Sequence, residues 1–190
     1  GKKVRQKDYL IEGKFPVIDQ GQDFIGGYTN DATKAIINQG SVVVFGDHTL
    51  VVKLVPFDFV PGADGIKVIK PSIIYHPKLF YFFISILAQK IPHKGYARHF
   101  QHLEKTRMPL PPYNEQVHIV ETIEELFSDL DNAIENLKKA QEQLKVYRQA
   151  ILWKGFEGGF TGGAKEWKTC RISDVCALID GDRGKNYPKK

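Results

Sequence analysis

The chain has 190 residues, 42% of them hydrophobic and 26% charged, with a formal net charge of +5, which suits one or two globular domains with an apolar core. Its longest apolar stretch, residues 79–88, is far shorter than the ~20 residues that a membrane span requires, and we see no secretory signal pattern. Cys170 and Cys176 have neither zinc-ligand spacing nor histidines nearby, so we expect a reduced, cytoplasmic protein without a metal site.

The charge is unevenly distributed along the chain. Residues 1–112 carry 15 Lys and Arg against 9 Asp and Glu, whereas residues 113–155 carry 5 against 8. The basic first segment could attract phosphate backbones, while the acidic middle segment has another task. Charge alone does not identify a nucleic-acid-binding protein.

The first 112 residues read as a mixed α/β domain. Short β-like runs at 15–18, 41–45, 50–55 and 65–70 alternate with the turn sequences DQGQ, GGYTND, GDHT and PGADG. An amphipathic helix is predicted from about residue 76 to residue 89. Its apolar content is so dense that we expect most of its surface to be buried in the core.

The turn Gly46-Asp47-His48-Thr49 separates two of the apolar runs. One interpretation is turn architecture, in which Asp47 accepts from backbone N–H groups of its own turn and Gly46 permits the conformation. A second is a DNA contact through His48. A third is a metal-dependent nuclease or hydrolase that uses Asp47, His48 and Asp64, although no second histidine at ligand spacing and no hydrolase motif appears in the sequence.

A long helix is predicted after Pro111 and Pro112, with Asn114 as its N-cap and Gly155 in its C-cap region. Apolar residues recur there at alternating spacings of four and three, a heptad seam typical of a helix packed along its length: Ile119, Ile123, Leu126, Leu130, Ala133, Leu137, Ala140, Leu144, Tyr147 and Ile151. About 40 residues at 1.5 Å each span roughly 60 Å, so the helix requires a partner. Its first half is acidic and its second half basic, which favours an antiparallel partner or simply follows the helix dipole.

The segment MPLPPYNEQVHIV, the following helix, YRQAIL and the exit FEGGFTG together resemble the conserved helical region of the specificity subunits of type I restriction-modification systems. The upstream sequences FPVIDQGQDFIGGYTND, VVVFGDHTLVVKLVPFDFVPGADGIKVI and KGYARHFQHLEKTRMPLPP resemble one class of that family's target-recognition domains. The resemblance implies an α+β fold with a target-recognition domain at 1–112 and a spacer and dimerisation helix at 113–155. Residues 156–190 would then form a glycine hinge and the start of a second recognition segment.

Members of that family generally carry two recognition domains and two conserved helices, whereas this chain holds one of each. The resemblance therefore implies a half-length subunit that acts as an antiparallel homodimer. It also implies a non-catalytic role without a cofactor, in which a methyltransferase subunit, and through it a restriction subunit, supplies the chemistry on double-stranded DNA.

Polar side chains in two segments and the tail are the candidate DNA contacts. The loop-like segment after residue 18 offers Gln20, Gln22, Tyr28 and Asn30, which could also belong to an ordinary polar loop. In the second segment we expect Arg98, His102 and Lys105 to share one helix face, which could equally be a solvated surface; its full set is Lys94, Tyr96, Arg98, His99, His102, Lys105 and Arg107. The tail adds Arg183 and Lys185.

The prediction is a sequence-specific DNA-binding subunit in which each recognition domain reads one half-site of a bipartite target. Two alternatives stay open: the metal-dependent nuclease at the Gly-Asp-His-Thr turn, and a coiled-coil adaptor that binds protein only. The adaptor would show no salt-dependent DNA affinity.

Overall fold

The structure is a computed structural model that describes residues 3–38, 40–62, 65–92, 98–163 and 167–177. The chain divides into two compact units, residues 1–130 and 131–190. The first unit contains all the strands of the described chain, two 3-10 helices, two short helices and the beginning of the long helix. The strands are β1 (Phe15–Ile18), β2 (Gly27–Thr29), β3 (Val42–Gly46), β4 (Val52–Val55), β5 (Val60–Pro61) and β6 (Ile66–Ile69), and the 3-10 helices are η1 (Gln6–Asp8) and η2 (Ala32–Lys34).

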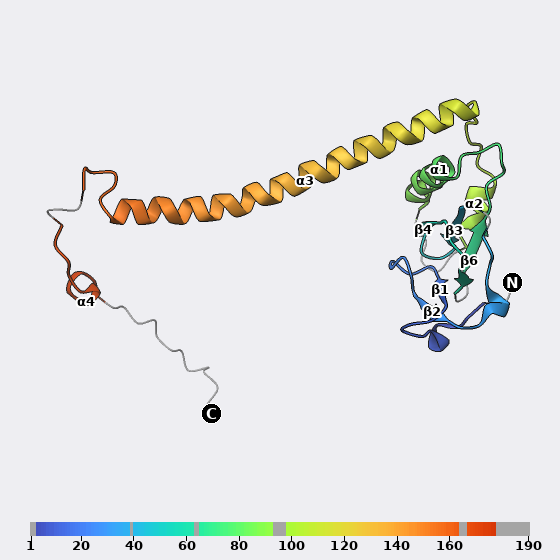
Figure 1. Cartoon of the computed structure of the whole chain (residues 1–190), viewed down its shortest axis with the longest axis horizontal. Helices are drawn as coiled ribbons and strands as arrows, with labels where there is room; N and C mark the ends of the chain where they lie inside the picture. Colours follow the sequence, from blue (N-terminus) through green and yellow to red (C-terminus); the bar gives the residue numbers. More distant parts are fainter. Residues whose placement is uncertain (1–2, 39, 63–64, 93–97, 164–166, 178–190) are drawn as a thin grey trace. The chain divides into compact units, whose positions relative to one another are not determined.

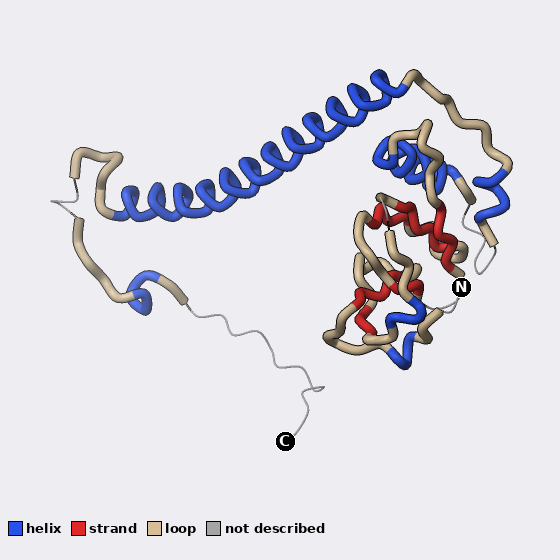
Figure 2. The backbone as a smooth tube through the Cα atoms, turned by 45° about the vertical axis from the view of Figure 1, so that its right-hand side comes forward, coloured by secondary structure: helices blue, strands red, loops and turns tan. Residues whose placement is uncertain are grey.

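Six strands form two three-stranded sheets (Figure 2). In the first, β1 lies between β2, which is antiparallel to it, and β5, which is parallel. In the second, β3 is central and pairs antiparallel with β4 and β6. The register sets Phe45 opposite Lys67 and Gly46 opposite Ile66, so the end of β3 lies beside the start of β6.

Strand β3 is the centre of the first unit because its apolar run is buried on both faces. Val42 and Val44 pack with Ile18 of β1 in one core cluster. Val43 and Phe45 pack on the other side with side chains of helices α1 (Pro77–Lys90) and α2 (Phe100–Glu104). A strand without polar alternation is typical of this double burial. In Figure 1 the two helices lie beside the sheet of β3, β4 and β6.

The predicted strand runs are all confirmed, but two strands were missed. Strand β2 falls within GGYTND, a predicted turn, and it is held by β1 and by an isolated bridge between Leu10 and Tyr28. Strand β5 has only two residues. The helix predicted at 76–89 is confirmed as α1. Ten of its fourteen residues are buried or half-buried, Ile84 and Ala88 fully, as its dense apolar content predicts.

Helix α3 (Tyr113–Phe156) confirms the predicted long helix, but Asn114 is its second residue and not its N-cap. The first helical hydrogen bond runs from the Gln116 N–H to the Pro112 carbonyl at 3.0 Å. The Gln116 side chain is buried, with Nε2 donating to the carbonyls of Ile74 and Pro111 at 3.0 and 2.8 Å and Oε1 accepting from the His76 N–H at 2.7 Å. A buried glutamine with all these bonds fixes the start of α3 against the loop before α1.

The end of α3 lies in the second unit and is closed by glycines. Gly158 adopts the left-handed conformation (φ +74°), its N–H donates to the Gly155 carbonyl at 3.1 Å, and the Gly159 N–H donates to the Lys154 carbonyl at 2.8 Å. This is a Schellman motif. Gly158 therefore ends the helix, and Gly155 lies inside its last turn. Beyond it, the described tail contains the four-residue helix α4 (Ile172–Val175).

The heptad seam of α3 is exposed over most of its length in the single chain. Leu126, Leu130, Leu137, Leu144 and Tyr147 each expose more than half of their surface. No helix in the described part of the chain is long and apolar enough to cross a membrane.

Candidate nucleic-acid interface

The Gly46-Asp47-His48-Thr49 turn is a tight reversal between β3 and β4. The Gly46 N–H donates to the Val51 carbonyl at 2.8 Å and the Leu50 N–H donates to the Gly46 carbonyl at 2.9 Å. Leu50, and not Gly46, takes the left-handed conformation (φ 60°). Glycine is needed at position 46 because a Cβ there would collide with the Thr49 hydroxyl and lie 2.9 Å from the Gln20 Cβ.

Asp47 is buried and ties this turn to a segment more than fifty residues further along the chain. Its carboxylate Oδ1 accepts from the Phe100 N–H at 2.8 Å. Its carbonyl accepts from the His99 N–H at 3.0 Å and lies 2.8 Å from His99 Nδ1. The expectation that Asp47 bonds N–H groups of its own turn was therefore wrong, because the carboxylate faces the start of α2.

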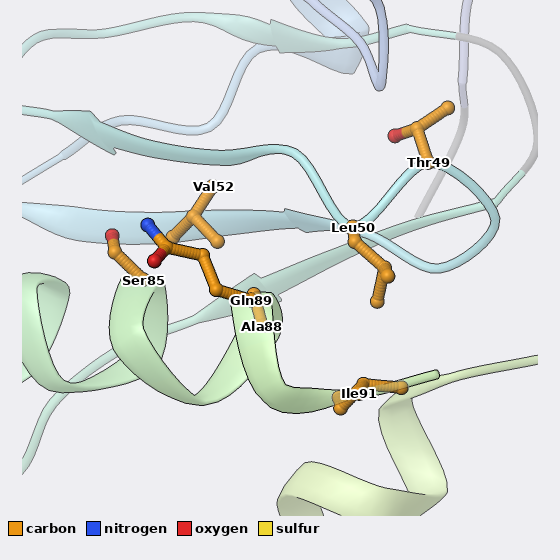
Figure 3. A pocket seen from close by; sticks show the side chains of 7 residues that line it. All are labelled: Thr49, Leu50, Val52, Ser85, Ala88, Gln89 and Ile91. Carbon is orange, nitrogen blue, oxygen red and sulfur yellow. The ribbon is translucent and has the colours of Figure 1, made fainter. Parts of the chain in front are cut away.

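The back of the turn rests on helix α1. A shallow pocket of about 370 Å³ separates the two, lined by Thr49, Leu50, Val52, Ser85, Ala88, Gln89 and Ile91 (Figure 3). In Figure 3 the Leu50 side chain points toward the helix that carries Ala88, whereas Thr49 points away from it. Leu50 therefore anchors the turn against the core cluster that contains Ala88 of α1.

A buried lysine holds the loop that follows β1. Lys53 of β4 is only 4% exposed, and its Nζ donates to the carbonyls of Asp19 and Asp23 at 2.9 and 2.5 Å. The Asp19 carboxylate lies 3.8 Å from the same nitrogen. Burial lowers the pKa of the Lys53 ammonium below its ordinary value, and the nearby charges of Asp19 and Asp23 oppose that shift. The buried ammonium therefore holds the two ends of the loop together through its hydrogen bonds to their carbonyls.

The same loop is hydrogen-bonded to the turn through Gln20. The Thr49 hydroxyl donates to the Gln20 carbonyl at 2.7 Å, and the His48 N–H donates to Gln20 Oε1 at 3.4 Å. Three segments that are distant in the sequence, residues 19–23, 46–49 and 98–100, are thereby joined into one surface. Of the candidates on this surface, Gln22 and Arg98 are exposed and Gln20 and His48 are half-buried.

Beside the turn lies a hollow of about 430 Å³, here called the basic hollow, lined by Lys3, Asp47, His48, Gly65, Ile66, Lys67 and Arg98. Three cations face one carboxylate there, and the cations come from the N-terminus, from β6 and from the segment before α2. The hollow is therefore suited to an anion.

The two remaining candidates of the first segment, Tyr28 and Asn30, lie in a strand and at an exposed position just after it, respectively. Tyr28 lies in β2, where its backbone exchanges two hydrogen bonds of 2.9 Å with Leu10, so it is not on a loop as predicted. Asn30 is exposed and its Oδ1 accepts from the Lys14 N–H at 2.9 Å, which fits the ordinary structural role of a turn residue.

The second candidate segment forms a shorter helix than predicted. Helix α2 contains only Phe100–Glu104, so Arg98 precedes it and Lys105 follows it, and the three-residue face with His102 does not form. His99 is 1% exposed, and its ring packs inward as a structural residue, which corrects its expected contact with DNA. His102, Lys105 and Arg107 are exposed. Lys94, Tyr96, Arg183 and Lys185 lie outside the described residues.

Three lysines that line or support this surface, Lys3, Lys53 and Lys67, are not among the candidates predicted from the sequence. Alternation within GIKVIK indicates that Lys67 faces away from buried Ile66, but only the β3–β6 register shows which turn it lies beside. Lys53 stands at the centre of an apolar run, where a buried charge with carbonyl partners is not visible from the sequence.

The nuclease alternative finds no metal site in the described part of the chain. No group of three or more His, Cys, Asp or Glu residues that could hold an ion occurs there. Asp64 lies outside the described residues, and the Asp47 carboxylate is bonded to Phe100.

Known proteins that are similar to this chain are DNA specificity subunits. Residues 1–145 match the family model described as the type I restriction modification DNA specificity domain. The chain is 26% identical over 181 residues to the specificity subunit of the type I restriction enzyme EcoR124I/EcoR124II from Escherichia coli, covering 87% of this chain and 42% of that protein. The crystal structure of the HsdS subunit from Thermoanaerobacter tengcongensis has a similar fold, with a TM-score of 0.57 and 20% identity over 83% of this chain and 41% of that one. The chain thus spans about two fifths of these relatives, and neither the nuclease nor the adaptor alternative gains support from them.

Proposed function

The chain belongs to the family of type I restriction-modification DNA specificity domains, and from this membership we propose that it recognises one half-site of a two-part DNA target. The proposal is supported above all by the way Gln20, His48 and Arg98 meet on one surface. Glutamine reads base edges in the major groove, and arginine beside it can hold the phosphate backbone in place. Their loops are held by the buried groups of Asp47 and Lys53, so the surface is ordered before DNA arrives.

We propose further that two copies of the chain pair through α3 in antiparallel orientation. The heptad seam has the same spacing read from either end, so a two-fold axis at Glu135 places Ile119 opposite Ile151 and Leu126 opposite Leu144. An antiparallel pair also brings the acidic first half of one helix against the basic second half of the other. The exposed leucines of the seam would become buried in such a pair.

In this arrangement the dimer carries two identical recognition units, and its target consists of two inverted half-sites. Major-groove openings on one face of DNA recur about every 34 Å, so the length of α3 sets the unread spacer. The chain itself is non-catalytic in this proposal. It acts in the cytoplasm with a type I methyltransferase subunit, and through that subunit with a restriction subunit.

The test combines the chain with the methyltransferase subunit of its own system and maps the methylated adenines on genomic DNA. The expected result is one bipartite motif with inverted halves and a constant spacer. The chain with Leu144→Lys, which breaks the seam, is expected to lose this methylation. Light scattering of the wild-type chain is expected to give a mass near twice 21.6 kDa.

Two results would contradict the proposal in different ways. A motif with two unrelated halves means that a second, different chain supplies the other half-site. The other result is the absence of any methylated motif, although the same methyltransferase is shown to be active in its native complex. That result would mean that this chain does not specify DNA.

A further inference from the structure

We propose that the basic hollow binds one phosphate of the DNA backbone, through Lys3, Lys67 and Arg98, and contributes affinity without reading sequence. The inference rests on the proposed DNA-binding function and divides its surface into two parts. Base readout is left to the loop that carries Gln20 and Gln22, and the hollow sets the position of the recognition unit on the duplex.

The charge of the hollow favours an anion. Its three cations are exposed, whereas the one carboxylate among its lining residues, Asp47, is 4% exposed and accepts from the Phe100 N–H. An anion entering from solvent therefore meets the ammonium and guanidinium groups, with the carboxylate beneath them already hydrogen-bonded. Arginine and lysine are the side chains that hold phosphates in proteins.

The geometry of the hollow is preorganised by its surroundings. Lys67 Nζ lies 5.6 Å from the centre of the Phe100 ring, which restricts a long side chain through a cation–π contact. Gly65 has φ +87°, and a Cβ there would lie 2.5 Å from His48 Cδ2. The close approach of this glycine to His48 keeps the floor of the hollow compact.

The lining also argues against a flipped or stacked base as the occupant. Its one apolar side chain is Ile66, which is 5% exposed and belongs to the core. Stacking of an unstacked base uses an exposed aromatic face, and the one aromatic ring in this lining is that of half-buried His48, beside Gly65. Two of the three cations are lysines, whose compact ammonium groups bind phosphate as point charges.

The test measures DNA affinity of the complex with the methyltransferase subunit, by fluorescence anisotropy across a series of salt concentrations. Lys3→Ala, Lys67→Ala and Arg98→Ala are compared on duplexes with and without the target. Each substitution is expected to weaken binding to both duplexes by the same factor, about tenfold. The variant with all three substitutions is expected to make the negative slope of log affinity against log salt shallower by about 0.9, the value for one phosphate contact.

Two matched variants separate position from charge. Lys90→Ala removes an exposed lysine at the end of α1, away from the hollow, and is expected to leave the affinity within twofold of wild type. Lys67→Arg keeps the charge and is expected to restore most of the affinity. The substituted side chains of the hollow are exposed, so circular dichroism spectra should match the wild type.

If the substitutions weaken binding to the target duplex alone, the inference is overturned, because the cations would then read bases. Unchanged affinity and salt slope in all three variants overturn it as well, while target binding by the wild type would leave the proposed function standing. If the wild type binds no DNA, a titration with inorganic phosphate followed by NMR replaces the duplex. Shifts at Lys67 and Arg98 that Arg98→Ala abolishes would assign the hollow to free phosphate instead of DNA, and no shifts would remove the anion site altogether.

Discussion

The two compact units differ in where they place their apolar and polar side chains. In residues 1–130 a double-sided core surrounds β3, and Asp47, Lys53, His99 and Gln116 are buried polar residues that join distant segments. In the described residues beyond 130 the one buried residue is Gly158, and Leu137, Leu144 and Trp153 each expose about two thirds or more of their surface.

This contrast indicates that the units depend on different sources of stability. The first unit hydrogen-bonds the buried side chains of Asp47, Lys53 and Gln116 to groups of the same unit, as a domain that folds alone is expected to do. The second presents a regular apolar seam with nothing in the described chain to cover it, and a seam of this kind requires another helix. Mutations should therefore act on folding in the first unit and on association in the second.

The largest expected effect is the loss of pairing on substitution in the seam. Leu144→Lys removes two leucines from each proposed dimer, which costs about 4 kcal/mol, or about a thousandfold in the dimer dissociation constant. The measurement is light scattering or analytical ultracentrifugation over a range of concentrations. Hydrogen exchange of the β3 amides should stay unchanged, because Leu144 lies in the second unit.

Val146→Lys is the matched control, since Val146 is 67% exposed and lies off the seam. It introduces the same charge on the same turn of the helix and should leave the mass unchanged. Equal loss of pairing in both variants would mean that charge or helix propensity, and not the seam, governs association.

The comparison also separates what the sequence could predict from what it could not. The apolar run of β3, the turn after it and the heptad seam are local patterns, and the structure confirms the strand, the turn and the helix. The surface around the turn depends on pairings between residues that are far apart. The bond from Phe100 to Asp47 spans 53 residues and that from Lys53 to Asp19 spans 34.

No periodicity encodes such distances, which is why His99 was expected on the surface and Lys67 was overlooked. Helix ends were misjudged for a related reason. Asn114 and Gly155 are suitable capping residues, but the bonds of Gln116 to the loop before α1 and the left-handed conformation of Gly158 decided where α3 begins and ends.

The next largest effect tests the first unit through Gln116. Gln116→Ala leaves the His76 N–H and the carbonyls of Ile74 and Pro111 without their partner, which should lower the free energy of unfolding by about 3 kcal/mol. Native-state hydrogen exchange of the β3 amides reports this change. Gln143→Ala, at an exposed position of the same helix, should change it by less than about 0.5 kcal/mol.

A smaller effect is expected at Asp47, where two substitutions separate acceptor from charge. Asp47→Ala leaves the Phe100 N–H unsatisfied and should cost about 2 kcal/mol of unfolding free energy. Asp47→Asn keeps an oxygen acceptor and should retain most of that stability and the DNA affinity. If Asp47→Asn were as damaging as Asp47→Ala, an oxygen acceptor would not suffice and the carboxylate charge itself would be required.

The smallest effect is a pH dependence at Lys53, the buried lysine that holds the loop at residues 19–23. Because burial lowers the pKa of this ammonium, the native state releases the proton at a lower pH than the unfolded chain does. Between the two pKa values the unfolded chain binds more protons, so the free energy of unfolding rises as pH increases toward 10.5. Lys53→Met lacks this contribution.

Urea denaturation followed by the NMR signals of β3 at several values from pH 7 to 10 should show the stability of wild type gaining on that of Lys53→Met. The raised pKa of Tyr75, caused by burial, acts equally in both proteins and cancels in the difference. A difference that shrinks with rising pH would mean that the carbonyls and Asp19 stabilise the ammonium by more than burial disfavours it.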